Sequence, residues 1–376
     1  MNNLLSLPVQ IDDPINAAIL AVSEDRIQGF QPDPFSEIAV LSEIPVDTVI
    51  ARVRAMLEAG VIRRVRQTLM ATNLAQGSLV AWQIPEEKLN AAFDYMFQQD
   101  PFSGHIVIRS TDSATPGSSY RLWTTLKVPQ GFSLAKHCEF LCRQTGAEKF
   151  LLMPAKRLFA LGVGHVRRRE MVPGSKSDEL ANVIGTEIVT LSDLDWQVLT
   201  ALKREFKPEE LVRDLWRARA EEAGVSLETF LEVGASLHAR KVIGRFSTFL
   251  EHVKPVNEQR VTRYNALFHW AVPGGREIEA GREVGRFDIM THAYWREGGP
   301  EFRNVNIMGV AHGMEKEMVL KHKAAIDAHL AEIGIPVGYT NVFWGGRSEI
   351  KPSEIAPQAY LDFCRANNLD SEAMKE

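Results

Sequence analysis

Leu79–Pro85 reads LVAWQIP, and far downstream Phe268–Pro273 reads FHWAVP. Both stretches are apolar runs that contain a tryptophan and end at a proline, a residue that cannot continue a strand's hydrogen-bond ladder. We take each as the first strand of a small α/β unit. A repeat of this kind indicates that one architecture is built twice in the chain.

The same order of elements follows each of these two strands. In the first copy the pattern predicts strands 78–84, 106–110, 120–128 and 149–154, with helices 86–98 and 133–145. In the second copy it predicts strands 265–272, 288–294, 304–312 and 337–343, with helices 276–284 and 315–333. The order βαββαβ predicts a ferredoxin-like sandwich in each copy.

A group of short helices precedes each sandwich. Helical periodicity predicts helices 15–22, 34–41 and 45–59 in the first copy and 194–206, 209–223 and 226–241 in the second. Val61–Val65 and Val242–Phe246 then follow as short strands, each typical of a β wing. The predicted fold class is therefore α+β, with two winged helix-turn-helix units, each followed by a ferredoxin-like βαββαβ sandwich.

These elements predict an order of domains along the chain. We expect a first winged unit at 1–70, a first sandwich at 75–155, a connector at 156–190, a second winged unit at 191–255, a second sandwich at 260–350 and a C-terminal tail helix at 351–376.

Composition is that of an ordinary globular protein: the 376 residues are 45% hydrophobic and 24% charged. No apolar run reaches the length of a membrane span, and the first residues lack the pattern of a signal peptide, so we expect a cytoplasmic protein. Cys138, Cys142 and Cys364 lack paired metal spacing and predict neither a disulfide framework nor a zinc site.

The charge of the first winged unit argues against DNA binding. Residues 1–60 contain three basic and nine acidic residues, a net charge of 3 − 9 = −6, which is the wrong sign for contact with phosphates. Helix 226–241 has no positive charge before its last turn. DNA is therefore an unlikely partner on charge grounds, although the architecture by itself suggests a regulator.

Several motifs resemble the siroheme decarboxylases, a tetrapyrrole-processing branch of the Lrp/AsnC-like proteins. They are Asp33–Ala39 (DPFSEIA), Gly60–Arg64 (GVIRR) and Ile243–Phe246 (IGRF), and above all Thr291–Arg296 (THAYWR) with Val305–Gly313 (VNIMGVAHG). The last two are similar to the family's His-x-Tyr-x-Arg segment and its later strand with Tyr-Asn and His-Gly. The resemblance covers about residues 14–345, in a fused two-module form.

The resemblance implies a lyase of heme or d-type heme biosynthesis. Such an enzyme removes acetate carboxyl groups as CO₂ from siroheme or a related iron tetrapyrrole, which is the substrate, and it needs no separate cofactor. Two alternatives stay open: an Lrp/AsnC-type transcription regulator, and a heme- or tetrapyrrole-binding protein without catalysis. The resemblance also implies a pseudo-dimer of modules within the chain, with a homodimer left open and no membrane partner.

The same resemblance indicates the candidate site residues. His292 and Tyr294 alternate on a predicted strand, so they share a face and suit proton delivery. His252 is a second candidate donor, and His252 or His292 is a possible iron contact, with no metal site made by the protein alone. Candidates for substrate binding are residues that suit carboxylates or a flat ring: Arg296, Arg245, Arg303, Asn306, His312, Arg109, Arg121, Arg64 and Trp123.

An alignment of 106–131 with 288–313 predicts that the two copies differ in chemistry. It places Ser110 opposite His292, Asp112 opposite Tyr294 and Ala114 opposite Arg296. On this alignment the first copy has lost the His-x-Tyr-x-Arg set. We therefore expect a degenerate site in the first sandwich and the active one in the second.

Overall fold

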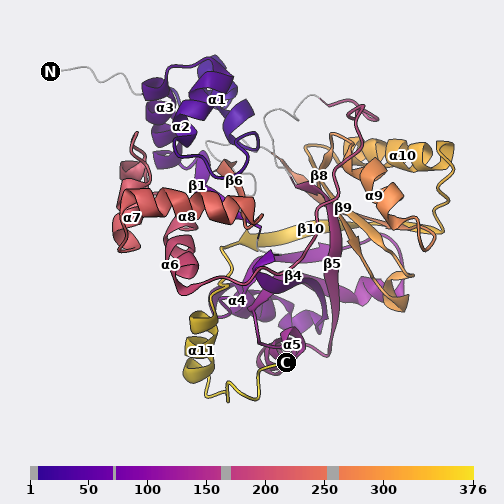
Figure 1. Ribbon diagram of the computed structural model, residues 1–376. Coiled ribbons are helices and arrows are strands. Elements are labelled where there is room, and N and C mark those ends of the chain that lie inside the picture. Colours follow the sequence, from indigo (N-terminus) through magenta and orange to yellow (C-terminus); the bar gives the residue numbers. More distant parts are fainter. Residues whose placement is uncertain (1–6, 71–72, 162–170, 252–261) are drawn as a thin grey trace. The chain divides into compact units, whose positions relative to one another are not determined.

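The computed structural model describes residues 7–70, 73–161, 171–251 and 262–376, which form two compact units (Figure 1). Unit 1 comprises the described parts of 1–70 and 189–261. Unit 2 comprises those of 71–161, 171–188 and 262–376. Each unit combines a segment of the first copy with its counterpart from the second copy. The predicted series of separate consecutive domains is therefore replaced by two interleaved units.

Unit 1 is mainly helical. Its elements are α1 (Pro14–Ser23), α2 (Pro34–Ser42), α3 (Val46–Glu58), β1 (Ile62–Leu69), α6 (Asp193–Leu202), η4 (Pro208–Glu210), α7 (Arg217–Glu222), α8 (Leu227–Ala239) and β6 (Ile243–Leu250). Asp13 and Asp33 cap α1 and α2 by accepting hydrogen bonds from main-chain amides of the first turn. Ser192 and Asp195 form a capping box at the start of α6.

The two predicted wings pair with each other. β1 and β6 form a two-stranded antiparallel sheet in which Ile62 lies opposite Leu250. The predicted helix 209–223 is wrong in its first half, where η4 is followed by non-helical residues before α7. Here the carbonyl oxygens of Pro208 and Leu211 accept hydrogen bonds from the Arg54 guanidinium, and the Pro208 carbonyl also accepts one from the Leu211 amide that closes η4.

Unit 2 contains two βαββαβ halves. The first is β2 (Ala75–Gln83), η2 (Glu86–Lys88), α4 (Leu89–Gln98), β3 (Ser103–Ser110), η3 (Pro116–Ser119), β4 (Tyr120–Pro129), α5 (Leu134–Thr145) and β5 (Lys149–Leu161). The second is β7 (Tyr264–Ala271), α9 (Glu277–Gly285), β8 (Met290–Arg296), η5 (Pro300–Phe302), β9 (Ile307–Gly313), α10 (Lys316–Glu332) and β10 (Tyr339–Ile350), and α11 (Pro357–Ala366) follows.

The two halves close one barrel in place of two separate sandwiches. The strand order around it is β10-β3-β4-β2-β5-β8-β9-β7, and all neighbouring strands in this order run antiparallel. β5 pairs with β8 and β10 pairs with β3, so both seams join a strand of one half to a strand of the other. Closure satisfies the edge strands that each four-stranded sheet would otherwise expose.

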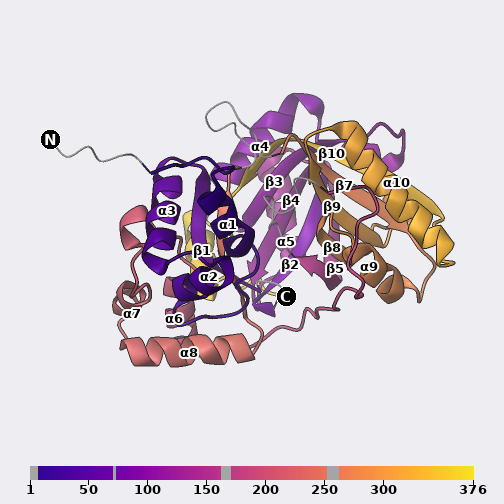
Figure 2. The ribbon, with the colours of Figure 1, turned by 90° about the horizontal axis from the view of Figure 1, so that it is seen from above.

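Three apolar cores hold unit 2. One lies between the first sheet and α4, α5 and α11, and another lies between the second sheet and α9 and α10, which cover the outside of that sheet in Figure 2. The third fills the barrel interior with side chains from both halves, including Trp123, Phe302 and Phe343. Alternation along each strand therefore directs one face to the helices and the other into the barrel.

Two predicted domain boundaries are wrong, namely the start of the connector at 156 and the separate tail at 351–376, because both segments make contacts within unit 2. β5 continues through 155–161, residues assigned to the connector, because these residues pair with β8. The predicted tail at 351–376 is part of the first half, since Tyr360, Phe363 and Met374 are buried in its core. Among the described residues no helix is both long and apolar enough to cross a membrane.

His269 on β7 is a fully buried imidazole inside the barrel. Neither ring nitrogen has a hydrogen-bond partner among the described residues, and the ring packs 4.9 Å from that of Phe343. Burial, together with the charges of Arg109 and Lys323, lowers its pKa to about 3. The native protein therefore keeps His269 neutral through the mildly acidic range, in which the unfolded chain protonates it.

We expect His269→Leu to weaken the acid sensitivity of folding. Between pH 7.5 and 5 the unfolded wild-type chain takes up a proton at His269 that the native state does not, so native stability falls as pH falls. This one group accounts for about 2 kcal/mol of the loss. Urea unfolding of both proteins at the two pH values measures it, and an identical pH dependence in the variant would contradict the assignment.

Candidate functional site

The inner face of β8 carries the polar side chains that the sequence motif singled out. Ala293 and Trp295 belong to the core beneath α9 and α10, so the alternate residues His292, Tyr294 and Arg296 face the barrel interior. The His292 and Tyr294 rings lie nearly parallel, with centroids 6.0 Å apart. The structure thus brings three predicted residues onto one surface.

Tyr294 lies between the imidazole and the guanidinium. The Arg296 guanidinium carbon is 4.4 Å from the centre of the Tyr294 ring. Burial raises the pKa of Tyr294, and the neighbouring Arg296 opposes part of that shift. The phenol therefore stays protonated at neutral pH and is available as a hydrogen-bond donor.

A chain of hydrogen bonds connects His292 to the first half. His292 Nδ1 lies 3.2 Å from Thr291 Oγ1, which lies 3.4 Å from His312 Nδ1. His312 Nε2 lies 3.2 Å from the Asn265 amide nitrogen, and the Asn265 amide oxygen accepts a hydrogen bond of 3.2 Å from Arg109. We call Arg109, Asn265, His312 and Thr291 the relay.

The direction of each bond in the relay follows from what each group can donate. Arg109 can only donate, so the Asn265 oxygen faces it and the Asn265 nitrogen donates to His312 Nε2. His312 therefore carries its proton on Nδ1 and donates to Thr291. The Thr291 hydroxyl donates to the Val310 carbonyl and so accepts from both histidines. His292 consequently donates from Nδ1, and Nε2 is its proton-exchanging atom.

Arg109 and Arg296 are buried at the two seams of the barrel, with exposures of 4% and 7%. Arg109 donates to the carbonyl oxygen of Phe343 on β10 at 3.3 Å, and Arg296 donates to that of Met153 on β5. Burial lowers the pKa of Arg109 to about 10 and also lowers that of Arg296. Both guanidiniums, predicted as substrate-binding groups, thus bind main-chain groups that join the halves.

The other candidates of unit 2 occupy varied places. Arg121 pairs with Glu86 at 3.0 Å on the outside, and exposed Arg303 lies over the ring of Tyr339. Asn306 is bound to both main-chain groups of Val272, a structural role. Trp123 is fully buried in the barrel core and donates to the Tyr120 carbonyl at 2.8 Å, so it presents no face to a flat ring.

Unit 1 holds the predicted arginines of the paired wings. Arg64 pairs with Glu205 at 3.1 Å, and Arg245 donates to the Glu24 carbonyl at 3.2 Å. The sequence reading overlooked Arg66, whose pKa falls to about 10 through burial and the nearby charges of Arg64 and Arg245. The guanidinium groups of Arg64, Arg66 and Arg245 thus lie close together on one sheet, with Glu205, Glu24 and Asp25 nearby. His252 lies outside the described residues.

Strand pairing shows which residues of the two halves are equivalent. The tryptophans of the two opening strands begin matching ladders across three strands: Trp82, Leu122 and Ile108 in the first half, and Trp270, Ile307 and Trp295 in the second. Ile108 is therefore the counterpart of Trp295, an offset of 295 − 108 = 187 residues.

This equivalence corrects the alignment made from sequence, whose offset was 292 − 110 = 182 and thus five residues short. The counterparts of His292, Tyr294 and Arg296 are His105, Val107 and Arg109. The first half therefore keeps the histidine and the arginine and lacks the tyrosine. The matching hydrogen bonds of Arg109 and Arg296 support this, because Phe343 and Met153 are also equivalent.

A signal for this correspondence was present in the sequence. His105 and Arg109 have the same four-residue spacing as His292 and Arg296. Counting forward from the repeated tryptophans comes within one residue of this correspondence, since His292 follows Trp270 by 292 − 270 = 22 residues and His105 follows Trp82 by 105 − 82 = 23. The alignment made from sequence instead counted across loops of different length. Asn265 and Thr291 carried no such signal, because their roles arise from contacts between strands.

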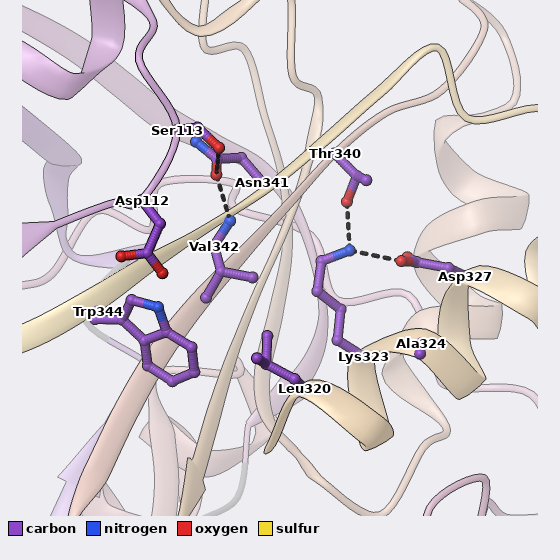
Figure 3. Close-up of a pocket in the computed structure, with 10 residues that line it drawn as sticks. All are labelled: Asp112, Ser113, Leu320, Lys323, Ala324, Asp327, Thr340, Asn341, Val342 and Trp344. Carbon is purple, nitrogen blue, oxygen red and sulfur yellow. Dashed lines mark hydrogen bonds and ion pairs between the residues drawn. The ribbon is translucent and has the colours of Figure 1, made fainter. Parts of the chain in front are cut away.

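A separate cavity of about 340 Å³ lies between α10, β10 and the loop after β3 (Figure 3). At one end Lys323 donates to Asp327 at 2.7 Å and to Thr340 at 2.5 Å, and at the other Ser113 donates to Asn341 at 3.0 Å. None of the predicted site residues lines this cavity. No group of three or more potential metal ligands occurs among the described residues.

Comparison with known proteins gives a domain and a fold. Residues 74–160 match the family model of an AsnC-like ligand binding domain. The search of curated proteins finds no match.

Two solved structures are similar over nearly the whole chain. The crystal structure of the siroheme decarboxylase NirDL has a TM-score of 0.65 and 18% sequence identity, covering 95% of this chain and all of the other. Its co-complex with an iron-uroporphyrin III analogue has a TM-score of 0.64 at 18% identity, covering 94% and 99%. These findings agree with the resemblance seen in the motifs, and they show that the chain has the fold of these structures.

Proposed function

We propose that this protein binds an iron tetrapyrrole of the siroheme class and removes acetate carboxyl groups from it as CO₂. The observation that carries the proposal is the His292–Tyr294 pair, stacked on the inner face of β8 and oriented by the relay. The likeness in fold to a siroheme decarboxylase crystallised with an iron-uroporphyrin III analogue supports the class of substrate.

In the proposed reaction, the bond between the acetate methylene and its carboxylate breaks and CO₂ leaves. The electron pair stays on the methylene carbon, where the conjugated macrocycle delocalises it. His292 then donates a proton from Nε2, which converts the methylene to a methyl group. Solvent returns the proton to His292, so each carboxylate removed consumes one proton. No separate organic cofactor enters this scheme.

The neighbours of His292 would assist this step. The neutral Tyr294 phenol can donate a hydrogen bond to the substrate without itself changing charge. Arg64 and Arg245 of unit 1 stay proposed carboxylate-binding residues, since guanidinium groups suit carboxylates in charge and shape. His252 remains a proposed second proton donor or iron contact.

The alternative function of a DNA-binding regulator has less support. On α3 the Arg52 guanidinium is buried against Asp13 and the Pro8 carbonyl, and that of Arg54 binds two carbonyls near η4. Bases held in this way do not reach phosphates. We propose that the helices of unit 1 are winged helix-turn-helix elements used for packing.

We also propose that the two joined halves of unit 2 form a pseudo-dimer that replaces a dimer of single modules, because their seams already pair all the edge strands of the barrel. A cytoplasmic location agrees with the unpaired state of Cys138, Cys142 and Cys364.

Anaerobic incubation with siroheme tests the activity directly. We expect the tetrapyrrole to lose the mass of CO₂ for each carboxyl removed. His292→Ala should slow this conversion by about 100-fold or more, because the proton donor is gone. His238→Ala, which removes an exposed histidine of α8, is the matched control and should convert siroheme at the wild-type rate. Mass spectrometry measures the products.

Two outcomes would contradict this proposal. A bound siroheme spectrum with unchanged mass would indicate a carrier without catalysis. Full conversion by a folded His292→Ala protein would remove His292 from the role of donor.

The relay makes a second prediction. Thr291→Val removes the hydroxyl that holds both histidines in a site with 2% exposure, whereas Thr291→Ser keeps it. We expect the valine variant to lose about 10- to 100-fold in kcat with a smaller change in KM, because His292 is misoriented. The serine variant should retain most of the activity. Steady-state kinetics measures both, and equal losses in the two variants would rule out orientation by the hydroxyl.

A further inference from the structure

The first half of unit 2 has its own polar inner face at the position equivalent to the proposed active site. Ile106 and Ile108 pack into the core beneath α4 and α5, so His105, Val107 and Arg109 face the barrel interior. His105 is partly exposed, and its Nε2 lies 2.8 Å from Ser348 Oγ on β10. The main-chain amide of His105 donates to Thr125 Oγ1 at 2.9 Å.

The residues beside His105 differ from those beside His292 in a consistent way. Continuing the paired ladders, Lys127 is the counterpart of His312 and Gly77 that of Asn265. Gly77 leaves room for the lysine, because a Cβ atom there would lie 3.2 Å from Lys127 Cγ. Where the second half has an imidazole held by an amide, the first half therefore has an ammonium group.

Three substitutions remove the features that the second half is proposed to use for proton delivery. Val107 replaces Tyr294, so no phenol stands beside His105. Lys127 and Gly77 replace the hydrogen-bonded pair that fixes the tautomer of the active histidine. What remains is a partly exposed imidazole and a cation on the same inner face, a combination that suits a negatively charged oxygen ligand.

We propose that His105 and Lys127 form a second binding site in the first half, which holds a peripheral carboxylate of the iron tetrapyrrole and delivers no proton to it. This inference rests on the proposed function for its ligand. It assigns the two halves different tasks on equivalent surfaces: the second half reacts with a carboxylate, and the first half anchors one.

Siroheme titration followed by absorption spectroscopy tests the site. We expect His105→Ala and Lys127→Met each to raise the Kd by about 10-fold, since each removes a charge-assisted contact. Lys149→Met, at an exposed lysine that begins β5, is the matched control and should bind siroheme like the wild type. His105→Gln keeps a hydrogen-bonding group beside Ser348 and serves if the alanine variant does not fold.

Each outcome decides the inference. Unchanged Kd values for folded His105 and Lys127 variants would overturn it. A loss of turnover at unchanged Kd in His105→Ala would also overturn it, since His105 would then act in the chemistry. A wild-type protein that binds siroheme but releases no CO₂ would refute the proposed activity alone. The comparison of Kd values would still measure binding at His105 and Lys127.

Discussion

The closure of the barrel by two equivalent seams is the constraint on which unit 2 depends. At each seam a strand of one half pairs with a strand of the other, and a buried arginine donates to a carbonyl of the joining strand: Arg109 to Phe343, and Arg296 to Met153. A buried guanidinium is costly unless main-chain or charged groups satisfy it, so each half needs the other to complete its structure. The interior aromatic core from both halves then fixes their register.

The same seams connect packing to chemistry. Arg109 stands at the β3–β10 seam and also donates to Asn265, the first member of the chain that reaches His292 through His312 and Thr291. A residue of the first half thereby helps to set the proton position on His292 of the second half. Because both halves belong to one chain, one half can differ from the other at equivalent positions.

The two halves differ at single positions, and the first half has not lost the whole His-x-Tyr-x-Arg motif. The first half retains the histidine and the seam arginine, and it differs at Val107, Lys127 and Gly77, where the second half has Tyr294, His312 and Asn265. Retention of Arg109 follows from its role in closure, which both halves need. The proposed division into an anchoring half and a reacting half rests on positions other than the seam arginines that close the barrel.

The sequence by itself determined the element types, the βαββαβ order of each half and the placement of His292, Tyr294 and Arg296 on one strand face, because hydrophobic periodicity and strand alternation are local properties. It also pointed to an AsnC-like domain and to a tetrapyrrole decarboxylase fold. Tertiary structure decided the closed barrel, the pairing of the two wings, the extension of β5 and the burial of α11. It also decided the hydrogen-bond partners of Asn265 and Thr291. These features depend on hydrogen bonds between strands far apart in the chain, and no local pattern of residues encodes such partners.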